Sequence, residues 1–218
     1  MKAFIYTGGE IFPEYITEHP KDGDLCIAAD SGWDNAEKTG DRNRVSLLVG
    51  DMDSVRSEYR EFVNGSGKHL EIIKVPSEKN LTDTQIAVET AIERGADEIV
   101  IIGGIGGRLD HTMSNISILE DMFFRHIHAT LVNGQSRVRY IRSTSHLVGR
   151  SVSYRYLSVI AADECVKGVS IEGCKYPLKN HKLERRLQFA VSNELVGNCA
   201  LISVKKGGIY IIESRDLL

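Results

Sequence analysis

The sequence contains no stretch of the roughly 20 apolar residues that a membrane-spanning helix requires. It also lacks an excess of positive charge, since 27 Lys and Arg residues stand against 30 Asp and Glu residues, for a formal net charge of -3. A protein built around a nucleic-acid backbone would need a basic face. The apolar start of the chain is too short for a signal peptide. We therefore expect a cytoplasmic protein, with neither a membrane nor a nucleic acid among its partners.

Cysteine is scarce, and none of the four cysteines forms a C-x-x-C pair. The spacing gives no support to a zinc site or to a thioredoxin-type redox site. Reduced thiols in a cytosolic protein are the simpler interpretation. The four are Cys26, Cys165, Cys174 and Cys199.

Two familiar phosphate-binding signatures are also missing. The nearest candidate for a Walker A loop, 65–69 (GSGKH), has the wrong spacing and ends in histidine. A dinucleotide fingerprint that starts at Gly104 would have Leu109 where its third glycine belongs. The motifs therefore argue against a P-loop kinase and against a dinucleotide-binding fold.

The first 130 or so residues alternate short apolar runs with amphipathic stretches. The clearest helix pattern covers 82–94, where Thr82 and Gln85 have the spacing of a capping box and Gly95 ends the helix. A second helix is expected over 112–125. Strands that alternate with helices predict an α/β fold, with a mostly parallel sheet and helices on both of its faces. The expected strands are Ala3–Tyr6, Leu25–Ala29, Leu47–Val49, Ile72–Val75, Ile99–Ile102 and Ala129–Val132.

After Asn133 the pattern changes to short segments that alternate apolar and polar residues. Turn residues separate these segments, and no long helix pattern occurs among them, which is typical of an antiparallel β domain. We therefore expect an α/β domain over 1–133 and a β domain over 137–218. The alternating segments are 138–140, 152–156, 166–172, 201–205 and 209–213.

The strongest chemical signal is the segment 50–54 (GDMDS), which follows the apolar run 47–49. Two unit charges about 4 Å apart repel by roughly 4 kcal/mol at an effective dielectric constant near 20. A hard divalent cation removes this repulsion, and Mg²⁺ prefers one or two carboxylates together with phosphate oxygens. Asp51 and Asp53 therefore predict a magnesium–phosphate site.

Three such motifs follow three predicted strands: 30–32 (DSG), 50–54, and 103–108 (GGIGGR). Parallel strands share a direction, so all three turns should meet at the carboxyl edge of the sheet, where open α/β sheets bind ligands. The glycine loop would let backbone approach phosphates, and Arg108 would add a bidentate donor. The alternative for this loop is a flexible surface loop without function.

The segment 76–83, which leads into the first predicted helix, allows two interpretations. Asp83 either complements the helix dipole or supplies a further carboxylate near the metal, with Lys79 facing phosphate. Asp110 and His111 are likewise either a helix cap and a surface histidine or parts of the same site as Arg108.

Together these motifs resemble the thiamine pyrophosphokinase family over nearly the whole chain. The resemblance rests on the segments 29–32, 50–54, 79–83 and 103–115 in the first half, and on 173–178 (GCKYPL) and 192–194 (SNE) in the second. Asn80 departs from the pattern, because the family usually has aspartate there.

The resemblance implies transfer of a pyrophosphoryl group from ATP to the hydroxyl of thiamine, giving thiamine diphosphate and AMP, with Mg²⁺ as cofactor. It implies an α/β domain for ATP, a β-sandwich for thiamine, and a homodimer with its sites between subunits. The implied ATP contacts are Lys79, Asn80, Thr82, Gly104, Gly106, Gly107, Arg108, His111 and Asn115. The implied thiamine contacts are Tyr176, Ser192 and Asn193. The implied metal ligands are Asp51, Asp53 and Asp83, and catalysis would involve these three with Asp30, Arg108 and Asp110.

Two other functions stay open at this point. The segment 49–55 superficially resembles the nucleophile motif of a haloacid-dehalogenase-like phosphatase, in which Asp51 would form a phosphoenzyme and Asp53 would act as acid and base. The other is a sensor that binds a nucleotide or thiamine without catalysis. Asn80 allows this function, because it replaces the aspartate that the family usually has there.

Overall fold

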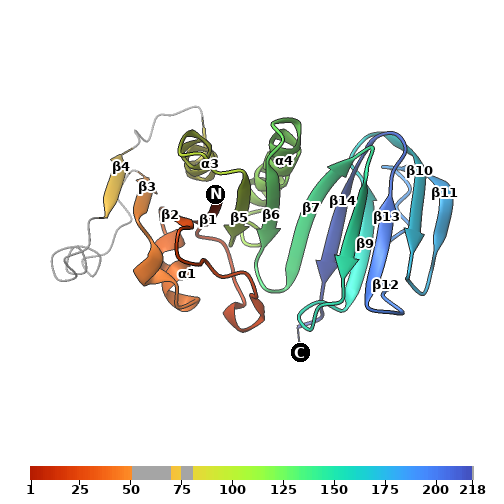
Figure 1. The fold of residues 1–218 in the computed structure, drawn as a ribbon, viewed down its shortest axis with the longest axis horizontal. Coiled ribbons are helices and arrows are strands. Elements are labelled where there is room, and N and C mark those ends of the chain that lie inside the picture. The colour runs from red at the N-terminus through yellow and green to blue at the C-terminus, as the bar shows by residue number, and fades with distance from the viewer. Residues whose placement is uncertain (51–69, 75–80, 218) are drawn as a thin grey trace.

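The computed structural model describes residues 1–50, 70–74 and 81–217, in which two β-sheets dominate (Figure 1). The strands of the larger sheet are β1 (Lys2–Tyr6), β2 (Leu25–Ala29), β3 (Leu47–Gly50), β4 (Glu71–Lys74), β5 (Glu98–Ile102), β6 (His128–Val132), β7 (Ser136–Arg142), β9 (Tyr156–Ala161), β12 (Asn193–Glu194) and β14 (Gly208–Ser214). Those of the smaller sheet are β8 (Ser145–Gly149), β10 (Cys165–Glu172), β11 (Leu178–Glu184) and β13 (Cys199–Ser203). The helices are α1 (Gly32–Lys38), α3 (Asp83–Glu93) and α4 (Leu109–Phe124), with short 3₁₀ turns η1 (Pro13–Tyr15) and η2 (Arg42–Arg44).

The larger sheet has the strand order β12-β9-β14-β7-β6-β5-β1-β2-β3-β4. Its β6-to-β4 part is parallel throughout, as the apolar runs predict. Successive side chains of a strand point to opposite faces. Ala3 and Ile5 thus pack against α3 and α4, whereas Phe4 and Tyr6 pack on the face that α1 covers (Figure 1). The prediction of helices on both faces is confirmed.

The local sequence predicts the N-terminus of α3 accurately and those of α1 and α4 less well. The capping box of α3 is present: the backbone N–H of Gln85 donates to Thr82 Oγ1 at 3.2 Å, and the Thr82 N–H donates to Gln85 Oε1 at 3.0 Å. The helix expected over about 112–125 is present as α4, but it begins earlier, at Leu109, with Asp110 in its first turn. The seven-residue α1 has too few turns to give a periodic pattern, and it was not predicted.

The second half is antiparallel, as predicted, and its two sheets pack face to face. Their shared core contains Val159 and Ile211 from the larger sheet and Val169 and Ile202 from the smaller one. The expected strand over 152–156 is wrong. Only Tyr156 belongs to a strand, and Val152 is almost fully exposed in an irregular connection.

β6 pairs with β7, so the hydrogen-bonded ladder continues from the parallel part into the antiparallel part. The division of the chain into domains 1–133 and 137–218 stays a prediction. In the part of the chain that the structure describes, every helix is too short or too polar to cross a bilayer.

Candidate functional site

A cavity of about 430 Å³ opens at the carboxyl edge of the parallel strands, and we call it the edge cavity. It lies where β1, β2 and β5 end and where α3 and α4 begin, which is the place where open α/β sheets bind ligands. Its lining residues are Thr7, Gly8, Gly9, Glu10, Ala29, Asp30, Ser31, Thr82, Asp83, Thr84, Gly103, Gly104, Gly106, Gly107, Arg108, His111 and Asn115.

Nine of the residues singled out from the sequence line this cavity: Asp30, Thr82, Asp83, Gly104, Gly106, Gly107, Arg108, His111 and Asn115. Asp110 does not line it but contacts Arg108. Asp51, Asp53, Lys79 and Asn80 lie outside the described residues. The structure thus brings together residues that are up to 85 positions apart, between Asp30 and Asn115.

Asp30 occupies a tightly confined position at the end of β2. Its φ of 47° lies in the left-handed region, which costs an ordinary residue roughly 1–2 kcal/mol. Its backbone N–H donates to Val49 O at 2.9 Å, which holds it against β3. A Cβ on Gly50 would lie 2.0 Å from Asp30 Oδ1, so a side chain there would displace the Asp30 carboxylate. Asp30 therefore lies directly against Gly50, the first residue of the 50–54 motif, where β2 and β3 end.

The glycine loop after β5 is fixed onto α4. Asn115 Nδ2 donates to Gly104 O at 2.9 Å, and the Gly106 N–H donates to Thr112 Oγ1 at 3.2 Å. Gly106 and Gly107 have φ values of 92° and 69°, which residues with a side chain rarely adopt. The loop is therefore an ordered turn with bare backbone facing the cavity, and its role toward phosphates stays a prediction.

Arg108 and Asp110 form a two-bond ion pair at the start of α4. Arg108 Nη2 donates to Asp110 Oδ2 at 2.6 Å, and Nε donates to Oδ1 at 3.2 Å. The hydrogen bonds from Arg108 outweigh the small effect of burial and hold the pKa of Asp110 below its usual range. Both side chains are exposed, so solvent screens the pair, and Arg108 can exchange its carboxylate partner for a phosphate oxygen.

Positive and negative groups meet in the edge cavity. The N-termini of α3 and α4 both open onto it, and helix N-termini favour anions through their unpaired N–H groups and dipole. Asp30 and Asp83 line the same space. Anion-binding helix ends beside carboxylates suit a phosphate chain that carries a divalent cation.

The chemistry of the carboxylates fits Mg²⁺, which takes oxygen ligands. Asp83 lies at the cavity, and Asp51 and Asp53 follow Gly50 directly in the chain. Within residues 1–50, 70–74 and 81–217, no three His, Cys, Asp or Glu side chains lie close enough to hold a metal by themselves.

In the second half, Asn193 joins the two motifs 173–178 and 192–194. Its buried side chain accepts from the backbone N–H of Tyr176 at 3.0 Å and donates to Tyr176 O at 2.7 Å. The N–H of Ser192 donates to Ser158 Oγ at 3.0 Å. The Tyr176 side chain is exposed. These residues therefore form one cluster at the β12 edge of the larger sheet, away from the edge cavity.

Comparison with known proteins agrees with this arrangement. The family model described as "Thiamin pyrophosphokinase, catalytic domain" matches residues 17–131, and the one described as "Thiamin pyrophosphokinase, vitamin B1 binding domain" matches residues 145–209. The chain belongs to the thiamine pyrophosphokinase family.

Individual relatives and solved structures support the same assignment. The chain is 29% identical over 185 residues to the thiamine pyrophosphokinase of Bacillus subtilis, covering 81% of this chain and 86% of that protein. The crystal structure of thiamine pyrophosphokinase from Bacillus subtilis superposes with a TM-score of 0.85 at 26% identity, over 100% of both chains. That of a thiamin pyrophosphokinase family protein from Enterococcus faecalis gives 0.84 at 27% identity, also over 100% of both.

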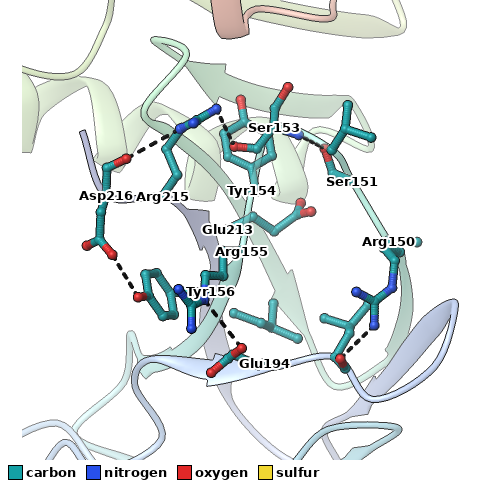
Figure 2. A pocket seen from close by; sticks show the side chains of 14 residues that line it. Arg150, Ser151, Ser153, Tyr154, Arg155, Tyr156, Glu194, Glu213, Arg215 and Asp216 are labelled. Carbon is teal, nitrogen blue, oxygen red and sulfur yellow. Dashed lines mark hydrogen bonds and ion pairs between the residues drawn. The ribbon is translucent and has the colours of Figure 1, made fainter. Parts of the chain in front are cut away.

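The second half of the chain contains another cavity, of about 370 Å³, that sequence reasoning missed (Figure 2). We call it the sandwich-mouth cavity, because the connection 149–157, Glu194, Leu195 and the end of β14 surround it. Two pairs of side chains bond across it: Arg155 contacts Glu194 at 3.4 Å, and Tyr156 donates to Asp216 at 2.7 Å. Such pairings join residues far apart in the sequence, so no local sequence motif predicts them.

Sequence reasoning also missed the loop after β1 in the edge cavity, which includes Glu10. A signal for it was present, because Gly8 and Gly9 follow the first predicted strand just as the other motifs follow theirs.

Proposed function

We propose that this chain is a thiamine diphosphokinase, which transfers a pyrophosphoryl group from ATP to the hydroxyl of thiamine and releases thiamine diphosphate and AMP. The observation that carries the proposal is the edge cavity, where a glycine loop, two helix N-termini, Arg108 and two aspartates converge. Family membership supports the reaction class.

The thiamine hydroxyl oxygen attacks the β-phosphorus of ATP in line. A bond forms between that oxygen and the β-phosphorus, the bond from the β-phosphorus to the oxygen bridging to the α-phosphate breaks, and the electron pair of that bond leaves with AMP. The hydroxyl proton passes to solvent water. Such transfers depend on positioning and charge neutralisation. The glycine loop, Arg108 and the N-terminus of α3 hold phosphate oxygens, and Asp30 lies beside the reacting groups.

Other predicted residues complete this assignment. Lys79, Asn80, Thr82, His111 and Asn115 serve the nucleotide side, and Asp110 orients Arg108. Mg²⁺ held by Asp51, Asp53 and Asp83 would neutralise charge on the phosphates.

Thiamine binds at the Tyr176, Ser192 and Asn193 cluster, and this requires a second copy of the chain. From β5 to β12 there are five strand spacings in the sheet, or about 24 Å at about 4.8 Å each. A thiamine molecule seated at β12 is too short to reach the edge cavity of the same chain. We therefore propose a homodimer in which the β half of one subunit faces the α/β half of the other. A monomer that turns over thiamine, identified by sedimentation velocity at assay concentration, would contradict this arrangement.

The test is product analysis after incubation with ATP, Mg²⁺ and thiamine. We expect AMP and thiamine diphosphate in a one-to-one ratio, with no AMP when thiamine is omitted. Release of ADP, or of AMP without thiamine, would contradict the proposal. A trapped phospho-aspartate at Asp51 would favour the phosphatase, and binding of both substrates without turnover would favour the sensor.

A further inference from the structure

Glu10 lies in the edge cavity, directly against the glycine loop. β1 lies between β5 and β2 in the sheet, so the residues that follow it lie between the glycine loop and Asp30. A Cβ placed on Gly106 would be 3.3 Å from Glu10 Cβ and 3.5 Å from Glu10 Oε2. Asn35 Nδ2 donates to Gly9 O at 2.7 Å and so fixes the backbone that precedes Glu10.

The Glu10 carboxylate has no partner of its own in the part of the chain that the structure describes. The side chain is exposed, and it makes no hydrogen bond or ion pair with residues 1–50, 70–74 or 81–217. Asp110 differs, because Arg108 neutralises it. An ionised carboxylate can only accept hydrogen bonds, and it repels phosphate. Within a nucleotide, Glu10 therefore suits a part that carries hydrogen-bond donors and no negative charge.

Only the nucleoside part of a nucleotide meets this requirement. The phosphates are drawn to Arg108 and the two helix N-termini, which leaves the sugar and base for the rim of the cavity. The adenine amine lies between ring nitrogens that are acceptors, so a carboxylate fits that edge poorly. The ribose 2′- and 3′-hydroxyls are two adjacent donors that match the two carboxylate oxygens, and acidic residues bind ribose hydroxyls in dinucleotide-binding folds for the same reason.

We propose that Glu10 accepts hydrogen bonds from the ribose hydroxyls and makes the edge cavity selective for ribonucleotides over deoxyribonucleotides. This inference rests on the proposed function, since it takes ATP as the ligand. Glu10 determines specificity and does not touch the transferred group, so its loss should weaken ATP binding and leave kcat nearly unchanged.

The test compares dissociation constants for ATP, 2′-deoxy-ATP, 3′-deoxy-ATP and tripolyphosphate, measured by calorimetry with Mg²⁺. A hydrogen bond to a charged group corresponds to about a 10-fold to 100-fold change in affinity. We expect the wild type to prefer ATP over either deoxynucleotide by at least about 10-fold, and Glu10→Ala to reduce this ratio to about one. Tripolyphosphate should bind the variant at least as tightly as the wild type, which also verifies that the variant is folded.

Glu14→Ala is the matched control, because Glu14 is an exposed carboxylate in η1 that does not line the cavity. It should keep the wild-type ratio. An unchanged ratio in Glu10→Ala, or a wild type without ribose preference, overturns the Glu10 assignment even if thiamine is converted. Loss of the ratio in Glu10→Ala together with a wild type that forms no AMP supports the Glu10 assignment and overturns the proposed reaction.

Discussion

The edge cavity and the sandwich-mouth cavity have similar volumes, about 430 and 370 Å³, but their polar groups are occupied differently. In the sandwich-mouth cavity, Arg155 and Tyr156 each bond a neighbouring side chain (Figure 2), and Glu213 accepts a hydrogen bond from Arg139 behind the cavity. The edge cavity has bare glycine backbone, two helix N-termini and the Glu10 carboxylate. The pairings in the second cavity join distant parts of the chain, whereas the first adds helix N-termini and the Glu10 carboxylate, which suit a ligand.

An ion-pair network behind the sandwich-mouth cavity shows most clearly that polar groups there bond one another. Arg137 donates twice to Glu213, at 2.6 and 2.8 Å, and once to Glu18 at 2.8 Å, while Arg139 donates to Glu213 at 2.6 Å. Glu213 is almost fully buried. The cluster joins the segment after η1 to β7 and β14. Volume alone therefore does not identify the functional site, and the two regions should respond differently to substitution.

The largest effect is expected from the acidic motif. Asp51→Ala should lower kcat by about 10³-fold or more, because it removes a metal ligand and its charge stabilisation. Asp216→Ala, which removes a carboxylate from the sandwich-mouth cavity, should stay within about twofold of the wild type. The measurement is AMP release at saturating thiamine, and near-normal turnover by a folded Asp51→Ala protein would refute the metal assignment.

An arginine from each cavity gives the next comparison. Arg108→Met should lower kcat/KM by about 100-fold, which is typical of losing one donor to charge that develops in a transition state. Arg155→Met should change kcat/KM by less than about threefold, because Arg155 lies outside the edge cavity and pairs with Glu194 at the protein surface. Equal effects of the two substitutions in steady-state kinetics would show that the distinction between the cavities is wrong.

For the free energy of unfolding we expect the larger effect from the residues behind the sandwich-mouth cavity. Glu213→Gln removes the buried carboxylate that the partly buried Arg137 and Arg139 share and leaves Arg137 only Glu18, which typically costs up to about 3–5 kcal/mol. Urea denaturation should detect this loss, and the protein that remains folded should still bind ATP. A loss below about 1 kcal/mol would mean that the network contributes little to the fold.

The smallest expected effect is the pH dependence of the contribution that Glu18 makes to the free energy of unfolding. Burial alone would raise the pKa of Glu18, but the hydrogen bond and charge of Arg137 outweigh it, so the pKa lies below the ordinary 4.5. Because the folded-state pKa is the lower one, this contribution is present above about pH 4.5 and is lost as the pH falls through the folded-state value. Glu18→Gln should cost about 1.5–3 kcal/mol at pH 7, and the difference should shrink below pH 4.5. A difference that does not depend on pH, in urea denaturation between pH 7 and pH 3, would exclude this role.

Local features of the chain could be predicted from the sequence, and pairings between distant residues could not. Short apolar runs such as Leu47–Val49 identify buried parallel strands, and the carboxyl-edge rule then brings Asp30 and Arg108 together without coordinates. The same rule, applied to Gly8 and Gly9, would have found Glu10.

Other features depend on tertiary contacts. The pairing of Arg137 with Glu213 spans 76 residues and leaves no local pattern. The segment 152–156 alternates like a strand, but its Tyr154 is buried under Arg137 in an irregular connection, with the guanidinium 4.8 Å from the ring centre. Asn193 was predicted as a thiamine contact, and its side chain also ties two loops together, a role that only the fold reveals.

The most direct measurement of the central claim is a titration of the ¹⁵N-labelled protein with ATP and Mg²⁺, followed by NMR. We predict that the amide resonances of Gly103–Arg108 and of the first turn of α3 shift most, while those of residues 150–156 and 213–216 stay within experimental error. The largest shifts at the sandwich mouth, with the glycine loop unchanged, would contradict the account.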